Sequence, residues 1–447
     1  MKIELPIDVK NIIETLEANG YEAFAVGGCV RDTLLLRIPG DWDITTSAKP
    51  EEVKALFSHT IDTGIQHGTV TVMKNHIGYE VTTYRIDGEY EDARHPKEVI
   101  FTANLVEDLK RRDFTINAMA YNDRAGVVDQ FDGIKDLQDK VIRCVGEPRE
   151  RFSEDALRML RAVRFAAQLG FSIDEKTKEA IKELAPTLEK VSKERIAVEL
   201  IKILVSDHPE EIRTAYELGL TAVFLPELDL AMKTEQNTPH HKYTVGEHTI
   251  AAMEHIQPDK NLRLIMLLHD LAKPLVLSTD ENGRAHFHGH TKLGANMAKE
   301  ILRRLKFDNA TIDLVYRMVK YHDERPPMDN MALVRRYISE VGPDYMPMMI
   351  EIKRADVMAQ SEYHYKEKME YIDRLKESYD EVIREKQCVQ KKDLSINGKD
   401  LIQMGMKPGE EMGALLEQLF DEVLKDPTQN DREKLLEQAN KFINPFI

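Results

Sequence analysis

Two aspartates, Asp41 and Asp43, stand two positions apart near the start of this 447-residue sequence. In an extended segment, residues at i and i+2 point to the same side, so both carboxylates should converge on one point. Mg²⁺ is commonly held by one or two carboxylates together with substrate phosphates. The spacing therefore predicts a Mg²⁺ site built by Asp41 and Asp43.

A glycine pair precedes these aspartates. Gly27 and Gly28 allow the backbone to approach a phosphate closely, and Arg31 can hold the same phosphate. A glycine turn and an Asp-x-Asp pair are each common in surface loops, but their combination favours a metal-assisted nucleotidyl site. The alternating pattern over residues 78–85 predicts a strand whose polar face carries Glu80 as a candidate third carboxylate, with a solvated glutamate as the alternative.

A second polar segment reads DLKRRDFTINAMA over residues 108–120. Arg111 and Arg112 can grip phosphates through paired hydrogen bonds, and Asp113 and Asn117 can bind ribose or phosphate oxygens. Capping of a helix is the other explanation, because the run after the arginines has helical character. The mixture of charged and small residues favours nucleotide binding.

A third segment repeats charged residues at a spacing of three, with Asp155, Arg158, Arg161 and Arg164. On a helix this spacing forms one polar ridge. Aspartate and arginine can present complementary donors and acceptors to base edges, whereas a salt-bridged solvated face is the ordinary interpretation of such a run. Residues 140–164 carry seven basic against four acidic side chains, so this region is locally basic.

The elements that must position these residues fall into two regions. Helical periodicity is expected over residues 8–19, and strand patterns over 67–74, 78–85 and 121–133. From about residue 140 to the end, helical periodicity dominates, including a charged helix over 362–387. The predicted fold class is α+β, with a mixed-sheet head followed by a long all-α body.

Composition excludes several classes of protein. A net charge of −16 argues against bulk attraction to nucleic acid, which leaves local basic surfaces as the place for such contacts. No run approaches the roughly 18 apolar residues of a membrane span, and the N-terminus lacks the apolar core of a signal peptide. The three cysteines lie far apart without metal-type spacing, which fits a reducing cytosol. We therefore expect a cytoplasmic protein without membrane partners.

Taken together, GGCVRDTLL…DWD, RRDFTINAMA, EDALRMLRAVRF and SKERIAVEL resemble, in this order, the bacterial class II tRNA nucleotidyltransferases. This family comprises the CCA-adding enzymes and their relatives, the poly(A) polymerases. The resemblance implies a polymerase-β-like nucleotidyltransferase head in which Asp41 and Asp43 bind two Mg²⁺. It also implies template-independent addition of CCA to the 3′ end of tRNA from CTP and ATP, by a two-metal mechanism without a covalent protein nucleophile.

The same resemblance assigns roles to the later segments. Arg111, Arg112 and Asp113 would contact the ribose, and Asp155 and Arg158 would pair with the base of CTP or ATP as an amino-acid template. The Glu-Arg pair of SKERIAVEL, residues 194–195, would brace the neck helices. A full-length loop over residues 86–96 argues against addition of CC alone. An A-adding enzyme or a poly(A) polymerase is the second expectation.

Histidines and aspartates form another set in the helical region. A His-Asp pair, His269 and Asp270, ends the apolar run LIMLLHD, where unpaired charge would be costly. Imidazoles and carboxylates are the donors that suit Mn, Fe, Ni or Zn. The order of His248, the His-Asp pair, further histidines and Asp356 resembles the HD superfamily of metal-dependent phosphohydrolases. That resemblance implies core metal ligands at these four residues.

Two further histidines, His290 and His322, are the candidates for a second metal in that site. A degenerate HD fold that only packs against tRNA or a partner is the alternative. The expected domains are a nucleotidyltransferase head over 1–140, neck and body helices over 141–235, an HD domain over 236–365, and a helical tail over 366–447.

Two other classes of function compete with a CCA-adding enzyme. One is a non-catalytic RNA-binding protein built on an inactive nucleotidyltransferase fold, against which the intact Asp41, Asp43, Arg111 and Asp113 speak. The other makes HD hydrolysis the principal activity and the head an RNA-recognition module. The sequence does not fix the oligomeric state.

Overall fold

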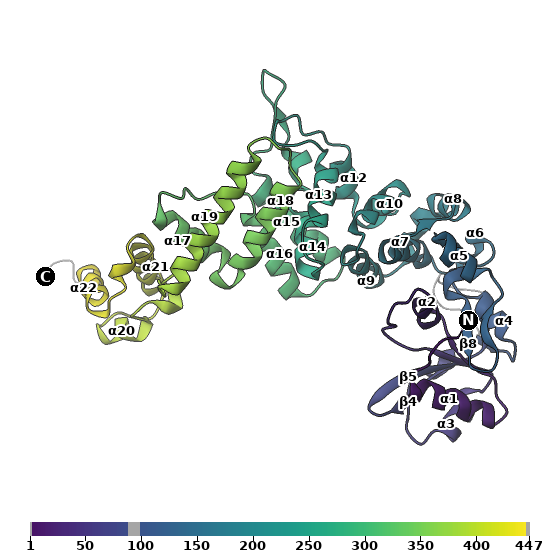
Figure 1. Cartoon of the computed structure of the whole chain (residues 1–447). Helices are drawn as coiled ribbons and strands as arrows, with labels where there is room; N and C mark the ends of the chain where they lie inside the picture. Colours follow the sequence, from purple (N-terminus) through teal and green to yellow (C-terminus); the bar gives the residue numbers. More distant parts are fainter. Residues whose placement is uncertain (1, 88–98, 444–447) are drawn as a thin grey trace. The chain divides into compact units, whose positions relative to one another are not determined.

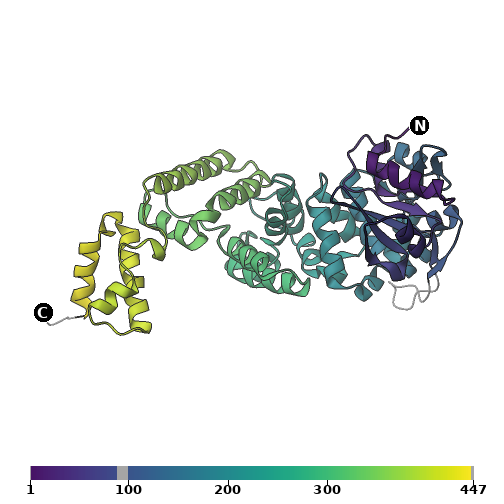
Figure 2. The ribbon, with the colours of Figure 1, turned by 90° about the horizontal axis from the view of Figure 1, so that it is seen from below.

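The structure, a computed structural model, describes residues 2–87 and 99–443. It divides the chain into two compact units, Met1–Pro226 and Glu227–Ile447 (Figures 1 and 2). The expected loop over residues 86–96 lies mostly outside the described residues. The α+β class expected from the sequence is confirmed, because a mixed sheet occupies the start of the chain and helices follow it.

Seven strands form the mixed sheet of the head (Figure 1). Their order is β3-β4-β5-β2-β1-β8-β9, in which β2 and β5 run parallel and the other neighbouring pairs are antiparallel. The strands are β1 (Ala23–Val26), β2 (Ile44–Thr46), β3 (Thr60–Gly64), β4 (Thr69–Lys74), β5 (Ile77–Thr83), β8 (Met119–Asn122) and β9 (Gly126–Asp129). A separate antiparallel pair is formed by β6 (Arg85–Asp87) and β7 (Val99–Phe101).

Burial explains the arrangement of these strands. The strands β2 (ITT), β1 (AFAV) and β8 (MAYN) are neighbours in the sheet and are buried along their whole length. The helix expected over residues 8–19 is confirmed as α1 (Ile7–Ala18), whose apolar face is buried and packs near β1. The other helices of the head are α2 (Gly28–Leu34), α3 (Pro50–Leu56), α4 (Leu105–Lys110) and α5 (Gly133–Asp139).

The segment after the arginine pair differs from the expectation. Its run was expected to be helix-like, but residues Thr115–Asn117 form one 3₁₀ turn that leads into β8. The neighbouring strands explain this result, since β8 pairs with both β1 and β9 through backbone hydrogen bonds. Tertiary pairing thus overrides the local helical pattern.

Helices dominate after residue 140, although short strands also occur. The first unit continues with α6 (Pro148–Glu154), α7 (Leu157–Leu169), α8 (Glu175–Leu184), α9 (Lys193–Leu204), α10 (Ile212–Glu217) and α11 (Thr221–Phe224). The expectation that strands end near residue 140 needs correction, because β10 (Val141–Ile142) pairs in parallel with β11 (Ser172–Ile173). A two-residue strand has no sequence pattern that periodicity can detect.

The second unit is built almost entirely of helices. They are α12 (Pro226–Met232), α13 (Val245–Glu254), α14 (Lys260–Leu268), α15 (His290–Arg304), α16 (Asn309–Tyr321), α17 (Met331–Val341), α18 (Met346–Met358), α19 (Tyr365–Arg384), α20 (Gly398–Gln403), α21 (Glu410–Lys425) and α22 (Arg432–Ile443). A small hairpin joins β12 (Ser278–Thr279) to β13 (Ala285–His286). The charged helix expected over 362–387 is confirmed as α19. No described helix is long and apolar enough to cross a membrane.

Two helical glycines of the second unit have opposite environments. A Cβ on Gly246 of α13 would lie 2.7 Å from the backbone nitrogen of Met232 and 2.8 Å from its Cα, so only glycine lets α13 approach α12 this closely. A Cβ on Gly413 of α21 would meet nothing within 4 Å.

We predict opposite signs for the same substitution at these sites. Gly246→Ala should lower the free energy of unfolding by about 2 kcal/mol, because a backbone must move to admit the methyl group. Gly413→Ala should raise it by about 0.5–1 kcal/mol, since alanine restricts the unfolded chain and favours helix. Denaturant unfolding of the full chain measures both values, and equal effects of the two variants would contradict the close packing of α12 on α13.

Candidate functional sites

The aspartate pair lies at the start of a central strand. Asp41 and Asp43 immediately precede β2, and the parallel register that pairs Ile44 with Val81 places Asp43 beside Glu80 of β5. Burial and the charge of Asp41 raise the pKa of Asp43 to about 6, Glu80 adds to this rise, and Arg112 opposes it. Three carboxylates therefore share one small region with excess negative charge, which is the donor set that a hard divalent cation requires.

The glycine turn lies against the same region. Gly27 has a φ of 84°, a conformation that favours glycine, and its backbone nitrogen donates to the carbonyl oxygen of Met119. A Cβ on Gly27 would lie 2.8 Å from a terminal nitrogen of Arg112. The turn leads into α2, which begins at Gly28. The absence of a side chain at Gly27 leaves room for the guanidinium of Arg112.

A chain of hydrogen bonds connects this turn to α7. Arg31 donates to Asn117 Oδ1 at 2.7 Å, and Asn117 Nδ2 donates to Asp113 Oδ1 at 3.2 Å. The other carboxylate oxygen of Asp113 accepts from Arg161 Nε at 2.7 Å. Burial would raise the pKa of Asp113, but Arg161 and Arg158 hold it well below its usual range. The structure thus brings together residues predicted from three separate segments.

A cavity of about 270 Å³ opens over this network. Five arginines and two aspartates line it: Arg111, Arg112, Asp113, Asp155, Arg158, Arg161 and Arg195. Six of these residues were predicted as nucleotide ligands, and Arg195 was expected only as a brace for the neck. The excess of guanidinium groups makes the cavity suited to a polyanion, in a protein whose net charge is −16.

Asp155 lies outside the helix on which the spacing placed it. The helical segment breaks there, with α6 ending at Glu154 and α7 beginning at Leu157, and Asp155 has an extended backbone. Its carboxylate accepts from the Leu157 backbone nitrogen at 3.1 Å and from Arg195 NH2 at 2.7 Å. The single polar ridge expected from the spacing is therefore wrong at its first residue, because capping of α7 by this side chain competes with a continuous helix.

The last arginine of the series packs behind the cavity. Arg164 is buried, lies 3.1 Å from Glu199 of α9, and stacks over the Phe165 ring at 4.1 Å. Burial, together with the charge of Arg161, lowers the pKa of Arg164 to about 10. Arg31 and Arg161 also lie over Phe165, so this ring packs against arginines from both α2 and α7.

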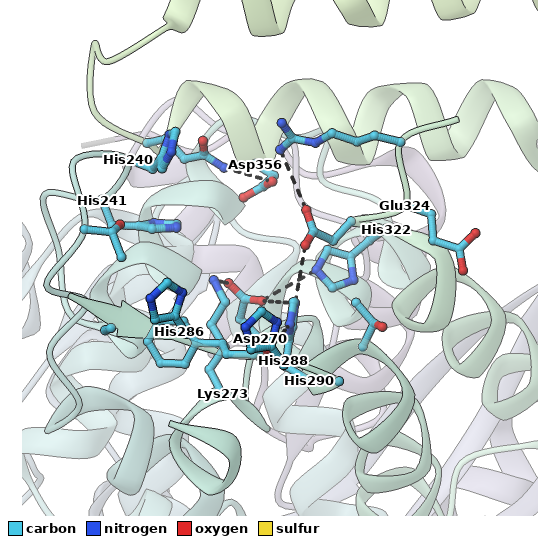
Figure 3. A pocket seen from close by; sticks show the side chains of 18 of the residues that line it. His240, His241, Asp270, Lys273, His286, His288, His290, His322, Glu324 and Asp356 are labelled. Carbon is cyan, nitrogen blue, oxygen red and sulfur yellow. Dashed lines mark hydrogen bonds and ion pairs between the residues drawn. The ribbon is translucent and has the colours of Figure 1, made fainter. Parts of the chain in front are cut away.

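A second cluster brings together all six predicted residues of the helical region. Figure 3 shows four of them, Asp270, His290, His322 and Asp356, at the pocket. His248 lies in α13, the His-Asp pair follows α14, His290 begins α15, His322 follows α16, and Asp356 lies in α18. His248 Nε2 is 2.9 Å from Asp356 Oδ1, and His269 Nε2 is 3.2 Å from Asp270 Oδ2. His290 Nε2 and His322 Nε2 lie 3.6 Å and 3.5 Å from Asp270 Oδ1.

The ring orientations suit metal binding. The Nδ1 atoms of His269, His290 and His322 lie 2.7–2.9 Å from backbone carbonyl oxygens, which assigns the proton to Nδ1 and directs the Nε2 lone pair into the cluster. Asp270 Oδ1 is buried with no hydrogen-bond partner among the described residues. Donor atoms of His248, His269 and Asp356 lie within 4.8 Å of one another, as do those of His269, Asp270 and His322. These donors fit a transition metal.

Lysine residues balance the charge of this cluster. Lys273 Nζ lies 2.6 Å from Asp270 Oδ2, a contact that the sequence analysis missed although Lys273 follows Asp270 by three positions. Burial would raise the pKa of Asp270, but His269 and Lys273 hold it well below the usual range. A cavity of about 440 Å³ opens onto the cluster, and its basic lining residues include Arg284, Arg325 and Lys368. The cavity therefore combines metal donors with groups that attract an anion.

Comparisons with known proteins identify the family. Three family models match successive parts of the chain: the Poly A polymerase head domain over residues 23–143, the "Probable RNA and SrmB- binding site of polymerase A" over 170–232, and tRNA nucleotidyltransferase domain 2 over 276–439. A CCA-adding enzyme of Ligilactobacillus salivarius (strain UCC118) is 37% identical over 441 residues, which cover 98% of this chain and 96% of that relative. The chain belongs to the CCA-adding enzyme family.

Other CCA-adding enzymes support the same conclusion. The relative from Anoxybacillus flavithermus (strain DSM 21510 / WK1) is 37% identical over 431 residues, covering 96% of this chain and 95% of its own length. The crystal structure of the Bacillus stearothermophilus CCA-adding enzyme in complex with CTP superposes with a TM-score of 0.74 and 28% identity, over 99% of this chain and 100% of that one. The expected family is thus confirmed for the nucleotidyltransferase, whereas the HD assignment stays a prediction.

The second cluster can be tested by metal content. We predict that the full chain, loaded with Mn²⁺, Zn²⁺ or Ni²⁺ and dialysed, retains at least one of these metals, because the Nε2 atoms and carboxylates already converge. His269→Ala should lose that metal, since His269 belongs to both donor groups. His255→Ala, which changes an exposed histidine after α13, is the matched control and should retain it. Elemental analysis checks the outcome; retention of the metal by His269→Ala would exclude this site.

Proposed function

We propose that this protein adds CCA to the 3′ end of tRNA, using CTP and ATP and no nucleic-acid template. The observation that carries the proposal is the arginine-lined cavity, one of whose arginines, Arg112, acts on Asp43 together with the carboxylates of Asp41 and Glu80, in a chain of the CCA-adding family. The proposed location is the cytosol.

The metal centre of the head is assigned to Asp41, Asp43 and Glu80. These residues would hold Mg²⁺, and the negative charge that raises the pKa of Asp43 supports this fit. When bound there, Mg²⁺ would supply Lewis-acid activation of the 3′-hydroxyl and would offset negative charge on the pyrophosphate group. No covalent protein nucleophile is needed, and burial raises the pKa of Cys29 to about 12, which keeps this nearby thiol protonated.

The protein residues position the nucleotide around that centre. The backbone of Gly27 and Gly28 admits the triphosphate, and Arg31 and Arg112 lie on its two sides. Arg111 and Asp113 contact the ribose. Such fixed charges reduce the cost of orienting the α-phosphate toward the 3′-hydroxyl.

The base is read at the far end of the cavity by Asp155 and Arg158. Asp155 is held by Arg195 and by the start of α7, so its carboxylate can accept from an exocyclic amino group, which both cytosine and adenine carry. Arg158 Nη2 donates to the carbonyl oxygen of Arg111 at 3.1 Å, which fixes its guanidinium beside the ribose-binding segment. Arg161 and Arg164 support this pair from α7 through Asp113 and Glu199.

For the second unit we propose an HD-type phosphohydrolase site. Its support is the convergence of His248, His269, Asp270 and Asp356, with His290 and His322 beside Asp270 (Figure 3). These residues would hold one or two Mn, Fe, Ni or Zn ions, which would supply Lewis-acid activation of water near neutral pH. The basic lining of the cavity would orient a phosphate ester.

The proposed reading of the base by Asp155 can be tested by the identity of the added nucleotide. We predict that Asp155→Ala reduces discrimination between CTP or ATP and UTP or GTP by at least tenfold, because the acceptor for the exocyclic amino group is lost. Asp174→Ala, which removes the N-cap of α8 outside the cavity lining, controls for loss of neck stability. Single-nucleotide incorporation kinetics measure the ratio, and unchanged discrimination in Asp155→Ala would contradict base reading there.

The two proposed activities should separate by substitution. A tRNA ending at the discriminator base should receive C from CTP alone and CCA from both nucleotides. Asp43→Ala should lower addition by at least a thousandfold while phosphate-ester hydrolysis persists, and His269→Ala should do the reverse. Asp62→Ala, at an exposed aspartate paired with Lys54, should leave both activities unchanged.

Gel analysis at single-nucleotide resolution and phosphate release measure these outcomes. Addition of A alone to a CC-ended tRNA would favour an A-adding enzyme or a poly(A) polymerase. Absence of any addition by a folded wild type would favour a non-catalytic RNA-binding protein, or hydrolysis as the principal activity. Loss of both activities in either variant would contradict two separate sites.

A further inference from the structure

A buried carboxylate of the head lies outside every residue assigned so far. Asp108, in α4, has 0% of its surface exposed. A buried ionised carboxylate is costly unless charged partners and hydrogen bonds satisfy it. Its neighbours therefore indicate what this charge stabilises.

The partners of Asp108 belong to two parts of the proposed active site. Its Oδ1 accepts from Arg111 Nε at 2.9 Å, and its Oδ2 lies 3.7 Å from Arg112 NH2. Its Oδ2 also accepts from Thr45 Oγ1 at 3.1 Å. Thr45 lies in β2, two positions after Asp43, which directly precedes that strand. One carboxylate thus connects both arginines to the strand that begins beside the metal-binding aspartates.

This connection opposes a specific repulsion. Arg111 and Arg112 both line the nucleotide cavity, and each guanidinium lowers the pKa of Asp108 although burial alone would raise it. Arg112 also lies against Gly27, where a Cβ would be 2.8 Å away. Without the carboxylate, Arg111 would lose its 2.9 Å contact, and Arg112 would keep only the weaker attraction of Asp43 and Asp113. The repulsion between the two guanidinium groups would then rise, and each would gain freedom to rotate away from the nucleotide.

We propose that Asp108 is a positioning residue for nucleotide binding, which acts by holding Arg111 and Arg112 toward the triphosphate and ribose and by fixing them to β2. The inference rests on the proposed nucleotidyltransferase function. Because Asp108 is fully buried, it acts through the arginines and does not touch the substrate. Its loss should therefore affect nucleotide affinity and leave tRNA affinity unchanged.

Asp108→Asn tests this role with nearly constant side-chain volume. We expect the Kd for CTP, measured by equilibrium titration, and the KM for CTP in addition to rise about tenfold, while the KM for tRNA stays within twofold. Asp136→Asn is the matched control, since Asp136 is also buried in the head and accepts from Thr115 Oγ1 and from Arg143, which is not among the cavity-lining residues. It should leave the CTP affinity unchanged.

A double-mutant cycle separates positioning from a general loss of stability. If Asp108 acts through Arg111, Asp108→Asn combined with Arg111→Ala should weaken CTP binding hardly more than Arg111→Ala alone. Three results would each overturn the inference. The losses of CTP affinity from Asp108→Asn and Arg111→Ala could multiply in the double mutant, Asp108→Asn could leave the CTP affinity unchanged, or Asp136→Asn could lower it equally. Should Asp108→Asn fail to fold, Thr45→Val removes the hydrogen bond from β2 to Asp108, together with a longer one to the carbonyl oxygen of Thr82. It should weaken CTP binding about threefold, and no change would overturn the inference.

The binding measurement keeps the two proposals distinct. CTP titration does not depend on turnover, so a wild type that binds CTP without adding it would refute the proposed function and still test Asp108. A wild type that adds CCA, with an Asp108→Asn variant of unchanged CTP affinity, would refute the positioning role alone.

Discussion

The head depends on the pairing of clustered arginines with buried carboxylates. A cavity that binds a nucleoside triphosphate through arginines needs several guanidinium groups close together, and these repel one another when no ligand is present. Asp108 and Asp113 place negative charge among the arginines, and Asp155 holds Arg195. Two of these carboxylates also contact a secondary-structure element: Asp108 accepts from Thr45 of β2, and Asp155 accepts from the first backbone nitrogen of α7. The charge balance of the site and the packing of the head are thus produced by the same residues, which preorganises the cavity for the proposed nucleotide.

The second unit also pairs clustered charges with groups of opposite charge, but there the clustered groups are acidic and the compensating groups are basic. There the acidic and imidazole groups form the centre, and lysines supply the compensating charge through Lys273 on Asp270 and through Lys368, which donates to Gln360, itself bonded to Asp356. Backbone carbonyls fix the histidine rings from behind. In both proposed sites, groups of opposite charge hold one another in place, and the polar groups that face the cavity can interact with a ligand.

Sequence patterns predicted those site residues that local spacing alone places together. The Asp41 and Asp43 pair, the alternation that exposes Glu80, and the His-Asp pair after an apolar helix all depend on local periodicity, and the structure brings each set together. Patterns failed where a distant contact decides the outcome. Asp155 leaves the helical ridge because Arg195 and the start of α7 bind it. The sequence assigned no role to Asp108, because its partners come from β2 and from the arginines after α4. Strand register, which local periodicity does not give, determines that Glu80 lies beside Asp43.

The central claim is that carboxylates and arginines of the free head already form the nucleotide site. A crystal structure of the protein with CTP and Mn²⁺ tests it most directly, because anomalous scattering locates the metal independently of the model. The account predicts metal between Asp41 and Asp43, the cytosine amino group on Asp155, and an Arg111–Asp108 pair that keeps its 2.9 Å contact. Metal bound elsewhere in the head, or a base that lies away from Asp155 and Arg158, would contradict it.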